Sequence, residues 1–161
     1  MILPLEMGVL SDIETLLQQG VAAHQQKRYE DAERCYRGIL QSQPTHPDAN
    51  HNLGILAVSF NDLEAALTLF KTAINANPKA EQFWLTYINT LIKANQLDEA
   101  RNALNQGKTQ GISVENIEAL TAQLQSLSQA PNNASFEQPS QEEVERLLQH
   151  HQQGEFEQAE S

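Results

Sequence analysis

Pro47 to Ala80 read PDANHNLGILAVSFNDLEAALTLFKTAINANPKA, and this stretch decides the fold. It predicts two helices that pack closely as a pair. Gly54 and Ala66 are small enough for two helices to cross closely, and Phe70 is large enough to fill the space between one pair and the next. Pro78 ends the second helix, because proline lacks the N–H group that a helix interior needs.

Similar residues return 34 positions before and after the residues of this stretch. Three series keep the step: a small residue, a large apolar residue, and a turn residue followed by an acid. They are Ala32, Ala66 and Ala100; Tyr36, Phe70 and Leu104; and Tyr29, Leu63 and Leu97. The chain is therefore predicted to hold three helix pairs, at residues 12–46, 47–80 and 81–112. The third is the most divergent, because Ile88 and Ile112 replace the glycine and the proline.

The spacing of Leu53-Gly54, Ala66, Phe70 and Pro78 resembles the L-G…A-x3-F…P pattern of the tetratricopeptide repeat family. The resemblance implies an all-α fold, a right-handed α-solenoid of antiparallel helix pairs. It also implies a non-catalytic scaffold for protein–protein interaction, which binds a peptide or a partner helix in the concave groove lined by the first helix of each pair. It implies no cofactor.

The resemblance also gives candidate binding residues on the first helices, at positions one helical turn apart. They are Leu17, Gln18, Val21, His24, His51, Asn52, Ile55, Val58, Leu85, Thr86, Asn89, Ile92 and Lys93. Family members that grip a terminal carboxylate carry basic and asparagine residues at these places. Only Lys93 is basic here, so a carboxylate clamp is not expected. Apolar members such as Val21 and Ile55 have an equal claim to packing against neighbouring helices.

Asn52-Leu53-Gly54 also resembles the asparagine-bearing repeats of O-linked N-acetylglucosamine transferases, in which concave asparagines hold an extended peptide backbone. Only Asn52 and Asn89 match that pattern. Bacterial proteins with such arrays often continue into a glycosyltransferase or sulfotransferase domain. The favoured interpretation is a scaffold segment of a larger bacterial protein, with substrate recruitment for such a transferase as the alternative. A free-standing adaptor is the rival to both.

The segments outside the three pairs carry predictions of their own. Residues 1–11 are expected to be an N-terminal extension, followed by a first helix from Asp12 to Lys27 that Ser11 and Glu14 open as a capping box. Residues 113–129 are predicted to be a capping helix for the solenoid, and residues 130–139 a linker. Residues 140–161 read as the start of a further unit, which predicts a truncated segment of a longer protein.

An apolar stripe in the last segment predicts self-association. It consists of Val144, Leu147, Leu148 and Phe156. Without a following helix to cover it, this stripe is expected to dock either in the chain's own concave groove or on a second molecule.

Composition limits the classes of partner and activity. The 10 Lys and Arg residues against 21 Asp and Glu give a net charge of −11, which disfavours binding to nucleic acid. Neither a long apolar run nor a basic secretory signal occurs, so no membrane partner is expected. The one cysteine, Cys35, cannot form an internal disulfide, which predicts a cytoplasmic protein. The five histidines lack zinc-site spacing, and no phosphate-binding loop or nucleophile motif is present. The chain is therefore predicted to be neither an enzyme nor a metal-binding protein.

Overall fold

The computed structural model describes residues 4–129, with side chains from Asp12 onward. These residues form seven α-helices and no strand, which confirms the all-α prediction. The helices are α1 (Pro4–Gln25), α2 (Tyr29–Ser42), α3 (Pro47–Ser59), α4 (Leu63–Ala76), α5 (Glu81–Lys93), α6 (Leu97–Gln110) and α7 (Val114–Gln129). The described residues as far as Gln125 belong to one compact unit, and Ser126–Gln129 belong to a second. The predicted linker, further unit and self-associating stripe lie outside the described residues.

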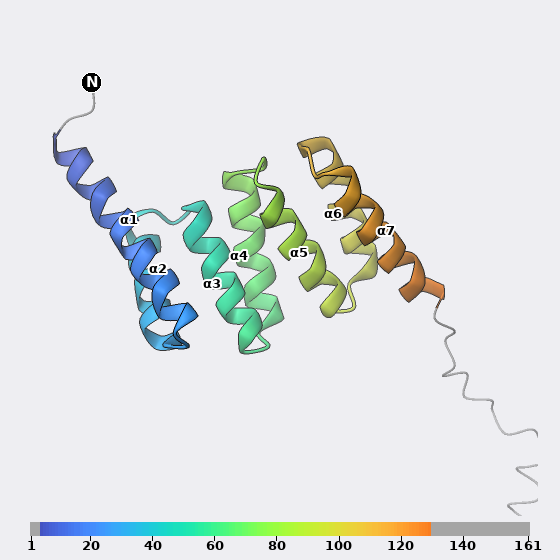
Figure 1. The fold of residues 1–161 in the computed structure, drawn as a ribbon, viewed down its shortest axis with the longest axis horizontal. Helices are drawn as coiled ribbons and strands as arrows, with labels where there is room; N and C mark the ends of the chain where they lie inside the picture. The colour runs from blue at the N-terminus through green and yellow to red at the C-terminus, as the bar shows by residue number, and fades with distance from the viewer. Residues whose placement is uncertain (1–3, 130–161) are drawn as a thin grey trace, which may run out of the picture. The chain divides into compact units, whose positions relative to one another are not determined.

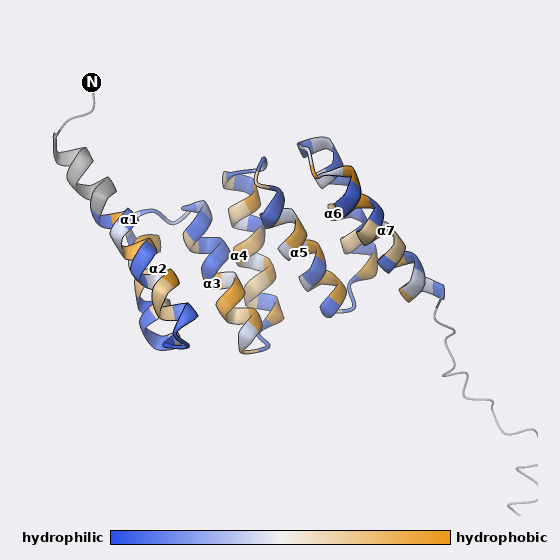
Figure 2. Cartoon of the chain, in the orientation of Figure 1, coloured by the Kyte–Doolittle hydropathy of each residue, from blue (hydrophilic) through white to orange (hydrophobic). Residues whose placement is uncertain are grey.

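The first six helices pack as three successive pairs. α1 packs on α2, α3 on α4, and α5 on α6 (Figure 1). α2 then contacts α3, and α4 contacts α5, so each pair lies against the next in chain order. Hydrophobic and hydrophilic residues alternate along these helices (Figure 2). Their apolar faces therefore meet in the core, whose largest fully buried side chains include Tyr36, Phe70 and Ile88.

α1 begins at Pro4, whereas the sequence predicted a start at Asp12. Proline is well tolerated in the first turn of a helix, because its missing N–H group would have no helical partner there and its φ angle is already helical. Ser11 consequently lies inside the helix and does not cap it. The described part of the expected N-terminal extension, residues 4–11, is therefore the first part of α1.

The same tight turn joins the two helices of each pair. Lys27, Asn61 and Asn95 stand at its left-handed position, with φ angles of 60°, 60° and 57°. The next residue's N–H then bonds back to a carbonyl five residues earlier, from Arg28 to Ala23, from Asp62 to Ala57 and from Gln96 to Leu91, at 2.9, 2.9 and 2.8 Å. These bonds use carbonyls that the helix end would otherwise leave without partners.

An aromatic ring lies directly on a glycine in the first two pairs. A Cβ atom added to Gly54 would lie 2.5 Å from Phe70 Cε1, and one added to Gly20 would lie 2.6 Å from Tyr36 Cε1. No real Cβ fits at such distances, so the aromatic ring can occupy this position only when the facing residue is glycine. In the third pair the equivalent residues are Ile88 and Leu104, both buried. The divergence predicted for that unit is thus a paired exchange, in which a larger residue at the glycine position accompanies a smaller one at the ring position.

A polar side chain ties each later pair to the proline turn before it. Asn50 Nδ2 donates to the carbonyl of Pro44 at 3.0 Å, and Trp84 Nε1 donates to the carbonyl of Pro78 at 2.9 Å. Both prolines and both donors are one repeat step apart. The asparagine and the tryptophan therefore make the same hydrogen bond to the preceding turn, although their side chains differ.

α7 packs on the third pair and is anchored by Glu81 at the start of α5. Its Leu120 and Leu124 are buried in the same apolar cluster as Trp84 and Leu104. Glu81 Oε1 accepts hydrogen bonds from the Asn116 side chain at 2.9 Å and from the backbone N–H of Ser113 at 2.8 Å. These bonds lower the pKa of Glu81, the one from Asn116 most of all.

Candidate functional site

A cavity of about 480 Å³ lies between α3 and α5, the first helices of the second and third pairs. We call it the α3–α5 groove. Its walls are formed by Ile55, Val58, Gln82, Leu85, Thr86, Asn89, Thr90 and Lys93. Six of the thirteen residues that the sequence singled out therefore meet around one cavity: Ile55, Val58, Leu85, Thr86, Asn89 and Lys93.

The α3–α5 groove combines an apolar wall with a polar edge. Ile55, Val58 and Leu85 are half-buried, and they supply the apolar wall. Asn89 and Lys93 are exposed and lie one helical turn apart on α5, where they present an amide and an ammonium group. An amide both donates and accepts hydrogen bonds, and a lysine only donates. The groove thus suits a ligand with an apolar side chain, free backbone groups and a nearby negative charge.

His51 lies beneath this surface instead of on it. Only 6% of the residue is exposed, and its ring packs against Phe83 and Phe70 with centroid distances of 4.6 and 5.5 Å. Burial lowers the pKa of His51, against a smaller opposing effect of Asp48. The lowered pKa favours the neutral ring, and burial keeps His51 away from the lining of the α3–α5 groove.

The hydroxyl of Thr86 lies within hydrogen-bond distance of His51. Thr86 Oγ1 donates its proton to the carbonyl of Gln82 at 2.9 Å, and it also lies 3.1 Å from His51 Nε2. When the hydroxyl proton is donated to the Gln82 carbonyl, the Thr86 oxygen accepts the second bond, which corresponds to the His51 tautomer with its proton on Nε2. The buried histidine thereby supports a residue that lines the groove.

The other predicted site residues lie away from the α3–α5 groove. Leu17 and Val21 on α1 pack against the core cluster of the first pair, and Ile92 packs against that of the third. The ring of His24 meets that of Tyr29 edge to face, at a centroid distance of 5.8 Å. Gln18 is exposed and Asn52 is half-buried, and neither lines this cavity.

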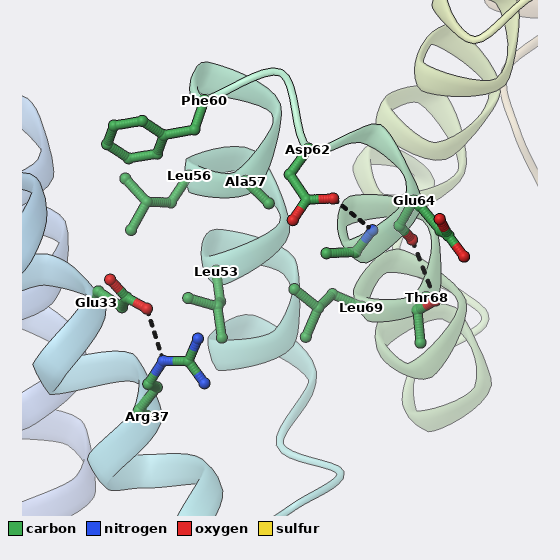
Figure 3. A pocket seen from close by; sticks show the side chains of 11 residues that line it. Glu33, Arg37, Leu53, Leu56, Ala57, Phe60, Asp62, Glu64, Thr68 and Leu69 are labelled. Carbon is green, nitrogen blue, oxygen red and sulfur yellow. Dashed lines mark hydrogen bonds and ion pairs between the residues drawn. The ribbon is translucent and has the colours of Figure 1, made fainter.

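A second cavity, which the sequence did not predict, lies between α2, α3 and α4 (Figure 3). We call it the α2–α4 groove; its volume is about 620 Å³. It is lined by Glu33, Arg37, Leu53, Leu56, Ala57, Phe60, Asp62, Glu64, Ala65, Thr68 and Leu69. The only sequence signal for it was Phe60, a large apolar residue placed at a polar turn, which is 64% exposed.

The described residues hold neither a metal-ligand cluster nor a membrane-spanning helix. In that part of the chain, no three His, Cys, Asp or Glu side chains are grouped as metal ligands. No helix among the same residues is long and apolar enough to cross a membrane.

The tetratricopeptide repeat family profile matches residues 23–84 and 57–124, which together span more than half of the chain. A comparison with curated protein sequences gave no match.

Solved structures with a similar fold include the TPR2B domain–pHsp70 complex of yeast Sti1, with a TM-score of 0.63 and 15% identity over 71% of this chain and 97% of that one. The first TPR of Spaghetti (RPAP3), bound to the HSP90 peptide SRMEEVD, has a TM-score of 0.62 and 17% identity over 72% and 93%. A Thermobaculum terrenum O-GlcNAc transferase mutant has a TM-score of 0.59 and 22% identity over 65% of this chain and 20% of that one. At these identities the likeness is one of fold.

Proposed function

Because the chain belongs to the tetratricopeptide repeat family, we propose that it is a non-catalytic protein-interaction scaffold that binds a peptide or partner helix in the α3–α5 groove. The observation that carries this proposal is the meeting of six predicted residues around one cavity of about 480 Å³. One protein of similar fold is bound to a peptide in its solved structure, and another is in a complex with pHsp70, which supports a peptide or protein ligand here as well.

Each part of the groove would recognise a different part of the peptide. An apolar ligand side chain would rest on Ile55, Val58 and Leu85, and its burial there would supply most of the affinity. The Asn89 amide would pair with a backbone N–H and C=O of the ligand, since it offers both a donor and an acceptor. Lys93 would favour an acidic residue next to the apolar one.

Selection from a random peptide library displayed on phage tests this function. We expect enrichment of peptides in which an apolar residue is followed or preceded by an acidic one. Synthetic versions should bind the wild-type chain at least about tenfold more tightly than the Leu85→Asp variant, because a charge would then face the apolar wall. A failure to select any peptide, or equal binding to Leu85→Asp, would contradict the proposal.

Substrate recruitment for a glycosyltransferase is the second candidate. It is favoured by the similarity to the O-GlcNAc transferase, of which this chain matches 20%, and by the asparagine at position 89 in the groove. The full reading frame of the parent gene decides between the two candidates. A transferase domain after Ser161 would favour recruitment, and its modification of a groove-binding peptide should then fall in the Asn89→Ala variant. A reading frame without such a domain would exclude substrate recruitment within the same chain and favour the interaction scaffold.

A further inference from the structure

The α2–α4 groove opens on the opposite side of α3 from the α3–α5 groove. Leu53, Leu56, Ala57 and Phe60 face the former, whereas Ile55 and Val58 face the latter. At 3.6 residues per turn these two sets point in opposite directions from the helix axis. A ligand in one groove therefore leaves the other free, so the α2–α4 groove can bind a partner whether or not the α3–α5 groove binds a peptide.

The floor of the α2–α4 groove is apolar and open. Leu53, Leu56 and Phe60 lie on the side of α3 that faces α2, and Leu69 reaches toward α3 from α4 (Figure 3). The Phe60 ring meets Tyr29 edge to face at a centroid distance of 5.5 Å, yet 64% of the residue stays exposed. The cavity of about 620 Å³ is large enough for an aromatic side chain and the backbone that carries it.

The third pair shows what fits in this space. One repeat step later, Tyr87 stands at the position of Leu53, and Glu99 stands at that of Ala65; both line the equivalent cavity, which holds only about 220 Å³. Leu91 replaces the smaller Ala57, whereas the smaller Ala94 and Ala103 replace Phe60 and Leu69. The third pair thus has a half-buried aromatic ring and a carboxylate around a cavity that is smaller than that of the second pair.

The charged residues at the rim of the α2–α4 groove indicate the charge of a complementary partner. The rim carries three carboxylates, from Glu33, Asp62 and Glu64, and one guanidinium, from Arg37. Arg37 and Glu33 neutralise each other, because Arg37 Nε lies 2.7 Å from Glu33 Oε1, and the carboxylates of Asp62 and Glu64 are left in excess. A second copy of this chain has a net charge of −11, so the negative charges of the two copies would repel each other at this rim. A cationic partner is complementary to it.

We propose that the α2–α4 groove binds an amphipathic basic helix of a partner protein, with one aromatic side chain inserted between α2 and α3 and Lys or Arg residues placed against the rim. The aromatic ring would take the place that Tyr87 occupies in the third pair. Flanking cations would pair with Asp62 and Glu64.

The probe is a synthetic helix-forming peptide with a single central Trp and Lys residues three and four positions to either side. Titration into the 15N-labelled chain should shift the amide signals of Leu53, Leu56 and Leu69 and leave those of Leu85 and Asn89 in place. A peptide with Ala for Trp should bind at least about tenfold more weakly, because aromatic anchors dominate such interfaces. A peptide with Glu for each Lys should not bind.

Variants of the chain supply the matched controls. Phe60→Ala should weaken the Trp peptide about tenfold, whereas Val58→Ala, on the opposite face of the same helix, should leave it unchanged. Leu53→Tyr copies the third pair and should close the site. Asp62→Asn keeps a side chain able to cap α4 while removing one rim charge, and should weaken binding up to about fivefold. Circular dichroism would verify that each variant is folded.

Three results would overturn this proposal. The first is equal binding of the Trp and Ala peptides, and the second is a set of shifts confined to the α3–α5 groove. The third is a concentration-dependent shift of Leu53 and Leu69 signals in the chain alone, because that would identify a second copy as the occupant.

Discussion

The burial of His51 makes a single side chain responsible for part of the pH dependence of stability. Its folded pKa lies below the ordinary value of 6.5, with burial as the main cause. The unfolded chain therefore takes up a proton before the folded chain does. The stability present above pH 6.5 is lost as the pH falls from there through the lowered folded pKa.

His51→Phe should remove this loss, because a phenyl ring can pack between Phe70 and Phe83 without titrating. We expect the free energy of unfolding of the variant to fall less than that of the wild type between about pH 7 and pH 5. Urea unfolding at several pH values measures the difference. Parallel curves for the two proteins would show that His51 does not titrate on unfolding in this range.

Gly54 and Phe70 act as one unit, which gives a second prediction at this scale. Phe70 is fully buried, so Phe70→Ala should lower the free energy of unfolding by about 3–5 kcal/mol. Gly54→Ile alone should also be strongly destabilising, because its Cβ would meet the ring at 2.5 Å. The double variant Gly54→Ile with Phe70→Leu copies Ile88 and Leu104. It should be more stable than the single variant Gly54→Ile and than the single variant Phe70→Leu. Simple addition of the separate losses of Gly54→Ile and Phe70→Leu, measured by urea unfolding, would contradict the coupling.

At the scale of the element, the repeated turn predicts a stabilising change. Asparagine occupies the left-handed position in the second and third turns, but lysine occupies it in the first. Asparagine tolerates this conformation better than residues with longer side chains. Lys27→Asn should therefore raise the free energy of unfolding by about 1 kcal/mol. The control is Lys79→Asn, which makes the same charge change in an exposed loop and should have little effect in the same thermal melts.

The anchoring of α7 depends on Glu81. Removal of the Glu81 carboxylate should therefore destabilise the start of α7 without affecting the rest of the chain. In Glu81→Ala, the Ser113 N–H and the Asn116 amide lose their acceptor. Amide hydrogen exchange at Asn116 and Ile117 should accelerate, while Glu118→Ala, on the exposed side of α7, should leave it unchanged. Since the Glu81 pKa is lowered on folding, the anchor is at full strength above pH 4.5 and is lost as the pH falls through the lowered value. Unchanged exchange in Glu81→Ala would mean that the apolar cluster alone holds α7.

The helix pairs could be predicted from the sequence because their determinants are local and recur at a fixed step. Ala66, Phe70 and Pro78 mark the interior and the end of a helix wherever they occur in this register. The start of α1 could not be predicted in this way, because the Ser11–Glu14 pattern of a capping box also occurs inside helices. The helix begins at Pro4.

The candidate site was predictable in part for the same reason. Ile55 on α3 and Leu85 and Asn89 on α5 line one cavity, and all three belong to the stripe that the family resemblance and the repeat step singled out. The burial of His51 was not, because it depends on rings from α4 and α5. The α2–α4 groove was also missed, since its volume depends on the sizes of side chains from three helices and not on the spacing within one.

At the scale of the whole molecule, the second helix pair has a cavity on each side of α3. One side offers an apolar wall with an amide and a cation, and the other offers an apolar floor with an acidic rim. Ligands of opposite charge are therefore expected on the two sides, and their binding should respond independently to substitutions at Val58 and Phe60.

The most direct test of the scaffold function is to locate a library-selected peptide on the chain by intermolecular NOEs from methyl groups. We predict NOEs from Ile55, Val58 and Leu85 to the apolar side chain of the peptide, and none from Leu53, Leu56 or Leu69. NOEs confined to the latter three residues, or a selected peptide that gives no NOE to either set, would contradict the scaffold function at the α3–α5 groove.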